Sequence, residues 1–190
     1  MKLTIIIPVY NEIKFINSLL NIVLNTKVKK QIIVVDDCSN DGTRELIIEN
    51  FKDKIDKLIL HKKNQGKGAA IISAQKYVNG DYVIIQDADL EYDPSDYSNL
   101  VEPFLKTDAQ VVYGTRFKGG GYSRLHFFWH YVANKILTLL TNIMTNLNMS
   151  DMETGYKVFK SEAIKSIDIK EDSFGIEPEI TIKLAKKKFI

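Results

Sequence analysis

Residues 86–94, QDADLEYDP, place carboxylates on alternating positions directly after an apolar run. In extended backbone, Asp87 and Asp89 would project to the same side, with their α-carbons about 7 Å apart. Such a pair suits Mg²⁺ or Mn²⁺, hard cations that combine one or two carboxylates with water and phosphate oxygens. Glu91 follows in the alternation and is a candidate third ligand. The alternative is a solvated acidic turn before a helix that Pro94 begins.

A second acidic cluster, VVDDCSNDGT, occupies residues 34–43 at the end of another apolar run. Asp36 and Asp37 could serve a ligand, one accepting from a sugar hydroxyl or a base N–H and the other from loop amides. The alternative is a turn of the kind that Asn and Asp side chains form, followed by a helix N-cap. That alternative accounts better for residues 39–42 than for the two adjacent aspartates.

Glycines and a lysine precede a predicted helix in the sequence NQGKG, residues 64–68. Backbone amides at a helix N-terminus suit a phosphate, and Lys67, between Gly66 and Gly68, adds a positive charge. The alternative is a flexible loop capped by glycine. The P-loop and dinucleotide-binding signatures are both absent from the sequence. Arg116 follows a further apolar run and suits a phosphate or carboxylate, the alternative being an exposed surface arginine.

Strand and helix patterns alternate along the first two thirds of the chain. Short β-branched runs predict strands at residues 3–9, 31–35, 57–61, 81–86 and 109–113. Periodicity and turn signals predict helices at residues 13–25, 43–51, 68–78 and 94–105, the last capped by Asp93. Continuously apolar strands favour a parallel sheet covered on both faces, so we predict an α/β sandwich. Ligands bind beyond the carboxyl ends of the strands in such sheets, which is where the polar motifs fall.

The composition is that of an ordinary globular protein, with 45% hydrophobic and 26% charged residues among 190. This length suits one domain, residues 1–190. A net charge of +2 gives no electrostatic reason to expect nucleic acid as a partner. Cys38 is the one cysteine, which excludes an internal disulfide and favours a reducing cytoplasm. Neither a signal peptide nor an uninterrupted apolar run of about 18 residues is evident.

Five ordered motifs closely resemble those of the inverting family-two glycosyltransferases. They are PVYNE (8–12), VVDDCSNDGT (34–43), NQGKGAA (64–70), DADLEYDP (87–94) and GTR (114–116). Within that family the chain looks like the transferases that make dolichol- or polyprenol-phosphate sugars, and the resemblance continues through DMETGYKVF (151–159) and FGIEPEIT (174–181). It implies a GT-A fold, which is a Rossmann-like nucleotide-sugar-binding α/β/α sandwich with a mostly parallel sheet. It also implies a donor-binding half, residues 1–116, and an acceptor-side half, residues 117–190.

The resemblance implies a role for each matching position. The nucleotide-sugar-binding residues would be Pro8, Tyr10, Glu12, Asp36, Asp37, Gly66, Lys67, Gly68 and Asp87. Asp37 would recognise the base, and Arg116 would face a phosphate of the donor or acceptor. Asp87 and Asp89 would hold Mg²⁺ or Mn²⁺, with Glu91 where the family often has a metal-contacting Gln. The sequence departs from the family pattern at residue 38, where many relatives have glycine in place of the cysteine.

The implied reaction moves a sugar from a GDP- or UDP-sugar to a polyprenyl or dolichyl phosphate with inversion. The attacking phosphate oxygen is already anionic, so catalysis rests on placement and on stabilising the leaving diphosphate, with Asp89 and Arg116 as catalytic residues. The first alternative is a glycan hydroxyl acceptor, which needs a base, and Glu177 and Asp151 are the candidates. The second alternative is a non-catalytic nucleotide-sugar-binding module.

The second half of the chain raises the question of a membrane. Residues 126–147 are the most apolar long stretch, and they predict either an amphipathic helix at a membrane interface or a helix packed on the core. We expect a peripheral location on the cytoplasmic face, beside a lipid-phosphate acceptor. Relatives continue beyond the position of Ile190 with basic residues that grip donor phosphates. We therefore expect a truncated C-terminus with reduced activity, or a membrane-anchored partner subunit, unless the lysines at 186–188 substitute.

Overall fold

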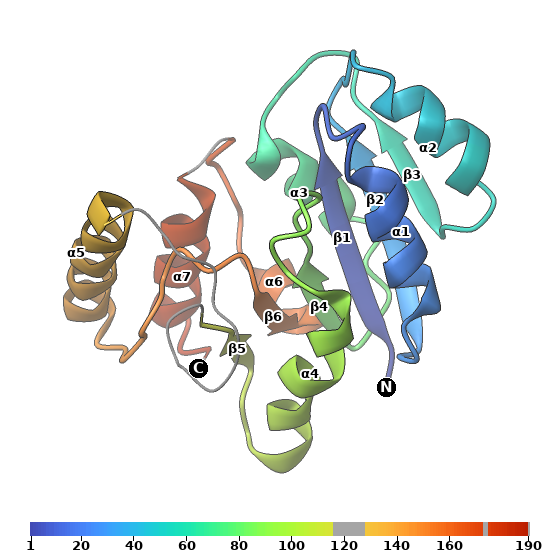
Figure 1. The fold of residues 1–190 in the computed structure, drawn as a ribbon. Helices are drawn as coiled ribbons and strands as arrows, with labels where there is room; N and C mark the ends of the chain where they lie inside the picture. The colour runs from blue at the N-terminus through green and yellow to red at the C-terminus, as the bar shows by residue number, and fades with distance from the viewer. Residues whose placement is uncertain (116–127, 173–174, 190) are drawn as a thin grey trace.

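A six-stranded sheet with helices on both faces makes up the structure, a computed structural model that describes residues 1–115, 128–172 and 175–189 (Figure 1). The strands are β1 Leu3–Val9, β2 Lys30–Asp36, β3 Lys57–Leu60, β4 Tyr82–Ile85, β5 Val111–Tyr113 and β6 Lys157–Lys160. The helices are α1 Ile16–Asn25, α2 Thr43–Phe51, α3 Lys67–Gln75, α4 Tyr97–Lys106, α5 Phe128–Thr145, α6 Ser161–Ser166 and α7 Ile176–Lys186, and the short 3₁₀ helix η1 spans Pro94–Asp96.

The strand order is β3-β2-β1-β4-β6-β5, and the first four strands of this order are parallel. Strand β6 runs antiparallel to both of its neighbours, so β5 again points the same way as β4. The carboxyl ends of β1, β2, β4 and β5 therefore lie at one edge of the sheet. This mixed, mostly parallel sheet confirms the predicted α/β fold class. Strand β6 was not among the predicted strands, because its sequence KVFK is short and begins and ends with lysine.

Two apolar cores cover the two faces of the sheet. Alternate residues of β1 point to opposite sides, with Ile5 and Ile7 in one core and Ile6 in the other. Helices α1, α2 and α4 pack on the first face, and helices α3, α6 and α7 pack on the second. Because both faces are buried, β1 is apolar along nearly its whole length, as the sequence pattern indicated.

Helix α5 has an inverted distribution of side chains. Its buried residues are the polar Asn134, Thr138 and Thr141, whereas apolar residues such as Ile143 and Met144 are 70% and 74% exposed. Of the two alternatives predicted for this stretch, an apolar face packed on the core is therefore wrong, and the interfacial helix stays a prediction. In Figure 1, α7 lies between α5 and the sheet. The buried side of α5 makes polar contacts: Asn134 donates to Asp151, and Thr138 accepts from the backbone N–H of Met152. Within the described ranges, no helix has the length and apolar character needed to span a membrane.

Candidate functional site

A cavity of about 520 Å³ lies at the carboxyl edge of the sheet, where β1, β2 and β4 end beside the N-terminus of α3. Its lining consists of Pro8, Val9, Tyr10, Glu12, Asp37, Asn64, Gly66, Lys67, Ala70, Asp87, Ala88 and Asp89. Most of the predicted donor-site residues are in this set. Val9, Asn64, Ala70 and Ala88 lie within the quoted motifs, but sequence reasoning assigned them no role. The volume is within the range of sites for small molecules.

Buried polar contacts fix the loop that carries Asp87 and Asp89. The side chain of Gln86 is fully buried, and its Nε2 donates to the backbone oxygen of Asp87 at 3.0 Å. Tyr97 Oη in turn donates to Gln86 Oε1 at 2.8 Å. Leu90 then takes a left-handed φ of 60°, and Asp89 Oδ1 accepts from the backbone N–H of Glu91 at 3.0 Å. The loop therefore turns immediately after Asp89 and leaves both aspartates at the cavity.

Lys67, the first residue of α3, joins two carboxylates that are distant in the sequence. Its Nζ lies 2.8 Å from Asp87 Oδ1 and 2.9 Å from Glu177 Oε1. Burial would lower the pKa of the Lys67 ammonium, but the charges of Asp87 and Glu177 raise it above its ordinary value. Lys67 is therefore a permanent cation that connects β4 to the start of α7.

Carboxylates outnumber cations among the residues that line the cavity. Burial raises the pKa of Glu12, and the negative charges of Asp89, Asp41 and Asp87 raise it further. The described residues contain no group of three or more His, Cys, Asp or Glu side chains placed to hold a metal ion unaided. Asp87 and Asp89 do supply the oxygen ligands that Mg²⁺ and Mn²⁺ prefer, with water and substrate phosphates completing the shell. The residues present thus fit a divalent cation that arrives together with a phosphate ligand.

Glu91 and Asp93, the other acidic residues of this loop, are exposed and do not line the cavity. The Glu91 side chain is exposed, and Glu91 is not among the residues that line the cavity. Its assignment as a metal ligand stays a prediction. Asp93 accepts from the backbone N–H of Ser95 at 2.9 Å and caps η1, which confirms the predicted cap.

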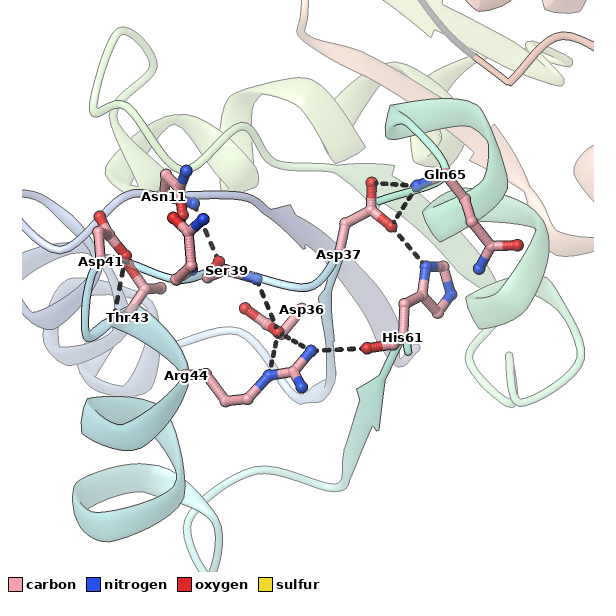
Figure 2. Close-up of polar contacts among 10 residues, drawn as sticks. Asn11, Asp36, Asp37, Ser39, Asp41, Thr43, Arg44, His61 and Gln65 are labelled. Carbon is pink, nitrogen blue, oxygen red and sulfur yellow. Dashed lines mark hydrogen bonds and ion pairs between the residues drawn. The ribbon is translucent and has the colours of Figure 1, made fainter. Parts of the chain in front are cut away.

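Asp37 lines the cavity and is held by a buried histidine, as Figure 2 shows. His61 Nδ1 lies 2.7 Å from Asp37 Oδ1, and His61 Nε2 lies 3.0 Å from Ser73 Oγ. Asp37 also accepts from the backbone N–H groups of Gln65 and Gly66, the latter at 2.7 Å. One function of this carboxylate is therefore to order the loop before α3. The role of His61 had no local signal in the sequence, because it arises from pairing across β2 and β3.

The amides expected to face a phosphate are largely engaged within the protein. Gly66 N–H donates to Asp37, and Gly68 N–H donates to the backbone oxygen of Asp172 at 2.9 Å. Gly68 has a steric reason for being glycine, because a Cβ there would lie 1.8 Å from the backbone oxygen of Glu171. This segment would therefore attract an anion mainly through the positive charge of Lys67, and less through these two backbone N–H groups.

Asp36 is not among the residues that line the cavity, and its buried side chain forms an ion pair with the partly exposed Arg44. Its Oδ2 accepts from Arg44 Nε at 2.6 Å and from the backbone N–H of Ser39 at 3.3 Å. Arg44 Nη2 also donates to the backbone oxygen of His61 at 2.7 Å, so the pair braces the ends of β2 and β3 (Figure 2). The other oxygen of Asp36, Oδ1, is buried and has no hydrogen-bond partner within the described part of the chain. The geometry gives Asp36 a positioning role, whereas its direct contact with a nucleotide stays a prediction.

The loops after β1 and β2 interlock beside the cavity. Asn11 N–H donates to Ser39 Oγ at 2.9 Å, and Asn40 N–H donates to Asn11 Oδ1 at 2.9 Å (Figure 2). Cys38 has a φ of 67°, in the left-handed region that glycine adopts most readily. The glycine that the family resemblance implies at this position would adopt this φ without strain, so the cysteine does not require a different turn.

The remaining catalytic candidates lie on the α5 and α7 side. Asp151 is 1% exposed beneath α5, where its Oδ1 accepts from Asn134 Nδ2 at 2.8 Å. Glu177 is occupied by Lys67, and neither carboxylate lines the cavity. Lys157 is almost fully buried nearby, and burial lowers the pKa of its ammonium to about 8 although Glu177 opposes this shift. Arg116 lies outside the described residues, so its role stays a prediction.

Comparisons with known proteins give a consistent family. The family model described as "Glycosyl transferase family 2" matches residues 4–168. A dolichol-phosphate mannosyltransferase of Pyrococcus furiosus is 28% identical over 96% of this chain and 53% of its own length. The hexosyltransferase Agl6 of low-salt glycan biosynthesis in Haloferax volcanii is 28% identical over 97% of this chain and 45% of its own length. The chain thus spans about half the length of these curated relatives.

A solved structure shares the fold. Glucosyl-3-phosphoglycerate synthase from Mycobacterium tuberculosis, in complex with Mn²⁺, UDP and glucosyl-3-phosphoglycerate, superimposes with a TM-score of 0.75. The sequence identity is 19%, over 98% of this chain and 66% of that one. At this identity the likeness establishes the fold alone.

Proposed function

The chain belongs to glycosyl transferase family 2, and on that premise we propose that it transfers a sugar from a nucleotide-diphosphate sugar to a lipid phosphate. The observation that carries the proposal is the convergence of Asp87, Asp89, Lys67 and Asp37 on one cavity at the carboxyl edge of the sheet. These groups offer carboxylates for a divalent cation, a cation for phosphate and an acceptor for a base or sugar. A metal-bound nucleotide-diphosphate sugar would use all three.

The donor is a UDP- or GDP-sugar in this proposal. Pro8, Tyr10 and Asp37 line the cavity. A carboxylate oxygen of Asp37 would accept a hydrogen bond from an N–H group of the base. Asp87 and Asp89 hold Mg²⁺ or Mn²⁺, which would neutralise the charge that gathers on the leaving diphosphate. The mycobacterial synthase of the same fold was solved with Mn²⁺ and UDP, which supports a donor and cofactor of this class.

The acceptor is a polyprenyl or dolichyl phosphate in this proposal, as the name of the Pyrococcus furiosus relative suggests. An anionic phosphate oxygen attacks the anomeric carbon in line with the departing diphosphate, so the configuration inverts. Such a nucleophile needs little help from a general base. This fits the surroundings of Asp151, which is buried and hydrogen-bonded, and of Glu177, which is paired with Lys67. A glycan hydroxyl acceptor would need one of these carboxylates to be free, and is less well supported.

Helix α5 offers a surface for the lipid part of such an acceptor. Its exposed apolar residues include Ile136, Leu139, Leu140, Ile143 and Met144, and the aromatic residues Phe128, Trp129 and Tyr131 lie at its N-terminal end. Aromatic residues at one end of an apolar face are typical of helices that lie in a membrane interface. We include in the proposal a peripheral position on the cytoplasmic face, with which the single free cysteine agrees.

Calorimetric titration with UDP and GDP, with and without Mn²⁺, tests the donor site. We expect one of the two nucleotides to bind in a Mn²⁺-dependent manner, and Asp89→Ala to remove that dependence. Asp53→Ala is the matched control, because it removes the same charge from an exposed position in the turn after α2, away from the residues that line the cavity. Absence of binding by either nucleotide, or unchanged metal dependence in Asp89→Ala, would contradict the proposal. Binding without turnover of polyprenyl phosphate would leave a nucleotide-sugar-binding module.

A further inference from the structure

Lys67 carries the one positive charge among the described residues that line the cavity, against the carboxylates of Glu12, Asp37, Asp87 and Asp89. Its ammonium divides its contacts between Asp87 inside the cavity and Glu177 outside it. The Lys67 and Asp87 side chains are 24% and 22% exposed, and that of Glu177 is 13% exposed. The ion pair with Asp87 therefore borders the cavity, and the ion pair with Glu177 lies deeper.

We propose that Lys67 is an exchangeable counter-ion of Asp87. In the cavity without donor it neutralises Asp87 and Glu177 together. When a divalent cation arrives with the donor diphosphate, Lys67 gives up Asp87 and turns to the phosphates while keeping Glu177. The inference rests on the proposed function, because it takes the incoming ligand to be a metal-bound nucleotide diphosphate.

The exchange follows from the geometry of one oxygen. Asp87 Oδ1 lies 2.8 Å from the ammonium, so a metal ion bound to that oxygen would bring two positive centres close together. Like charges at such a distance repel strongly where solvent screening is weak. Lysine can respond because its charge ends a flexible four-carbon stem. Since Lys67 begins α3, its side chain can move without disturbing the helix.

This arrangement gives Glu177 a positioning role. Its carboxylate holds the deeper side of the ammonium, so Lys67 stays beside the cavity after it releases Asp87. Glu177 also lies in the first turn of α7, so the state of the cavity is linked to that helix. A metal ion alone would displace Lys67 from Asp87 without replacing that contact. A metal ion that arrives with a diphosphate would supply a phosphate oxygen as the new second partner of Lys67, beside Glu177. Metal and nucleotide should therefore bind with positive coupling.

The decisive experiment measures the binding of Mn²⁺ alone by electron paramagnetic resonance, and of nucleotide with Mn²⁺ by calorimetry. Lys67→Met should tighten the binding of Mn²⁺ alone by about tenfold and weaken nucleotide binding by about tenfold, each equal to about 1.4 kcal/mol. Lys67→Arg should restore both constants toward the wild type. Lys76→Met is the matched control, because it removes the same charge at the exposed C-terminal end of the same helix and should change neither constant.

A double-mutant cycle tests the part played by Glu177. Glu177→Gln leaves Lys67 wholly to Asp87, so it should weaken the binding of Mn²⁺ alone, and this effect should disappear in the Lys67→Met background. Thermal melts verify that each variant is folded. Mn²⁺ affinity that is unchanged or weaker in Lys67→Met, or undetectable in every variant, overturns the inference. An effect of Glu177→Gln that is equal in both backgrounds also overturns it.

The two proposals fail in different ways. If neither UDP nor GDP binds to the wild type with Mn²⁺, the proposed function fails. The titrations of Mn²⁺ alone still report whether Lys67 competes for Asp87. If nucleotide binds as proposed but Lys67→Met does not tighten the binding of Mn²⁺ alone, the exchange of Lys67 is wrong and the function stands.

Discussion

His61 Nδ1 lies 2.7 Å from Asp37 Oδ1, so a buried histidine directly after β3 supports a carboxylate that lines the cavity. The same Asp37 accepts from the backbone N–H groups of Gln65 and Gly66, and Gly66 also lines the cavity. Proposed binding of the nucleotide base and the order of the loop before α3 thus both depend on the Asp37 side chain. Substitution of His61 tests how far this side chain depends on its histidine partner.

Replacing His61 with leucine should destabilise the fold and weaken nucleotide binding. The change leaves Asp37 and Ser73 without their histidine partner, which typically costs about 1–3 kcal/mol for buried polar groups. Urea denaturation measures the first effect, and calorimetry with Mn²⁺ and nucleotide measures the second. Ser73→Ala is the control, since it removes only the contact to Nε2 and should cost less. Equal nucleotide affinity in wild type and His61→Leu would argue against a supporting role.

The turn at Cys38 makes a prediction about backbone strain. With a φ of 67°, Cys38 occupies a conformation that costs a non-glycine residue about 1–2 kcal/mol. Cys38→Gly removes this strain, at some cost in unfolded-chain entropy, whereas Cys38→Ala keeps the strain and removes only the thiol. We expect Cys38→Gly to be more stable than Cys38→Ala by about 1 kcal/mol in urea denaturation. The opposite order would show that the turn does not hold this φ in solution.

Lys157 predicts a pH dependence of stability. Burial lowers the pKa of its ammonium from 10.5 to about 8. Below pH 8 the lysine is charged in both the folded and unfolded states, and the cost of burying the charge is fully present. Between about pH 8 and 10.5 the unfolded chain binds more protons than the folded one, so stability contributed by this group rises with pH.

The measurement is a difference between wild type and Lys157→Met. Other titrating groups are common to both proteins, so the difference isolates Lys157. As the pH rises from 7.5 to 9.5, the unfolding free energy of the wild type should increase relative to that of the variant by on the order of 1–2 kcal/mol. A constant difference across this range would mean that the lysine titrates normally.

Helix α5 predicts an inverted response to substitution. Ile143 is 70% exposed, so Ile143→Ser should change the unfolding free energy by no more than about 0.5 kcal/mol. Asn134 is 6% exposed and donates to the buried Asp151, so Asn134→Leu should cost about 1–3 kcal/mol. Urea denaturation of the two variants gives the comparison. A larger loss for Ile143→Ser would mean that the apolar face is covered within the protein.

The fold was predictable because its signals are local. Continuously apolar runs became β1, β2 and β4, and the alternation with helices led to the sheet with both faces covered. Asp93 is a local cap, and its hydrogen bond to Ser95 spans only two residues. Strand β6 was missed because four residues with a lysine at each end carry no apolar pattern of their own. It is a strand because β4 and β5 lie on either side of it.

The sequence by itself determined which residue types meet at the sheet edge, because parallel strands deliver their carboxyl ends to one place. Tertiary structure alone decided what each carboxylate does there. Asp36 and Asp37 are adjacent in the sequence but have different partners. Asp36 pairs with Arg44, whereas Asp37 contacts His61 and lines the cavity. Lys67 pairs with both Asp87 and Glu177, which are too far apart in the sequence for any local pattern to specify the contact. Charges act through space, so the partner of a buried carboxylate is fixed only when the chain has folded around it.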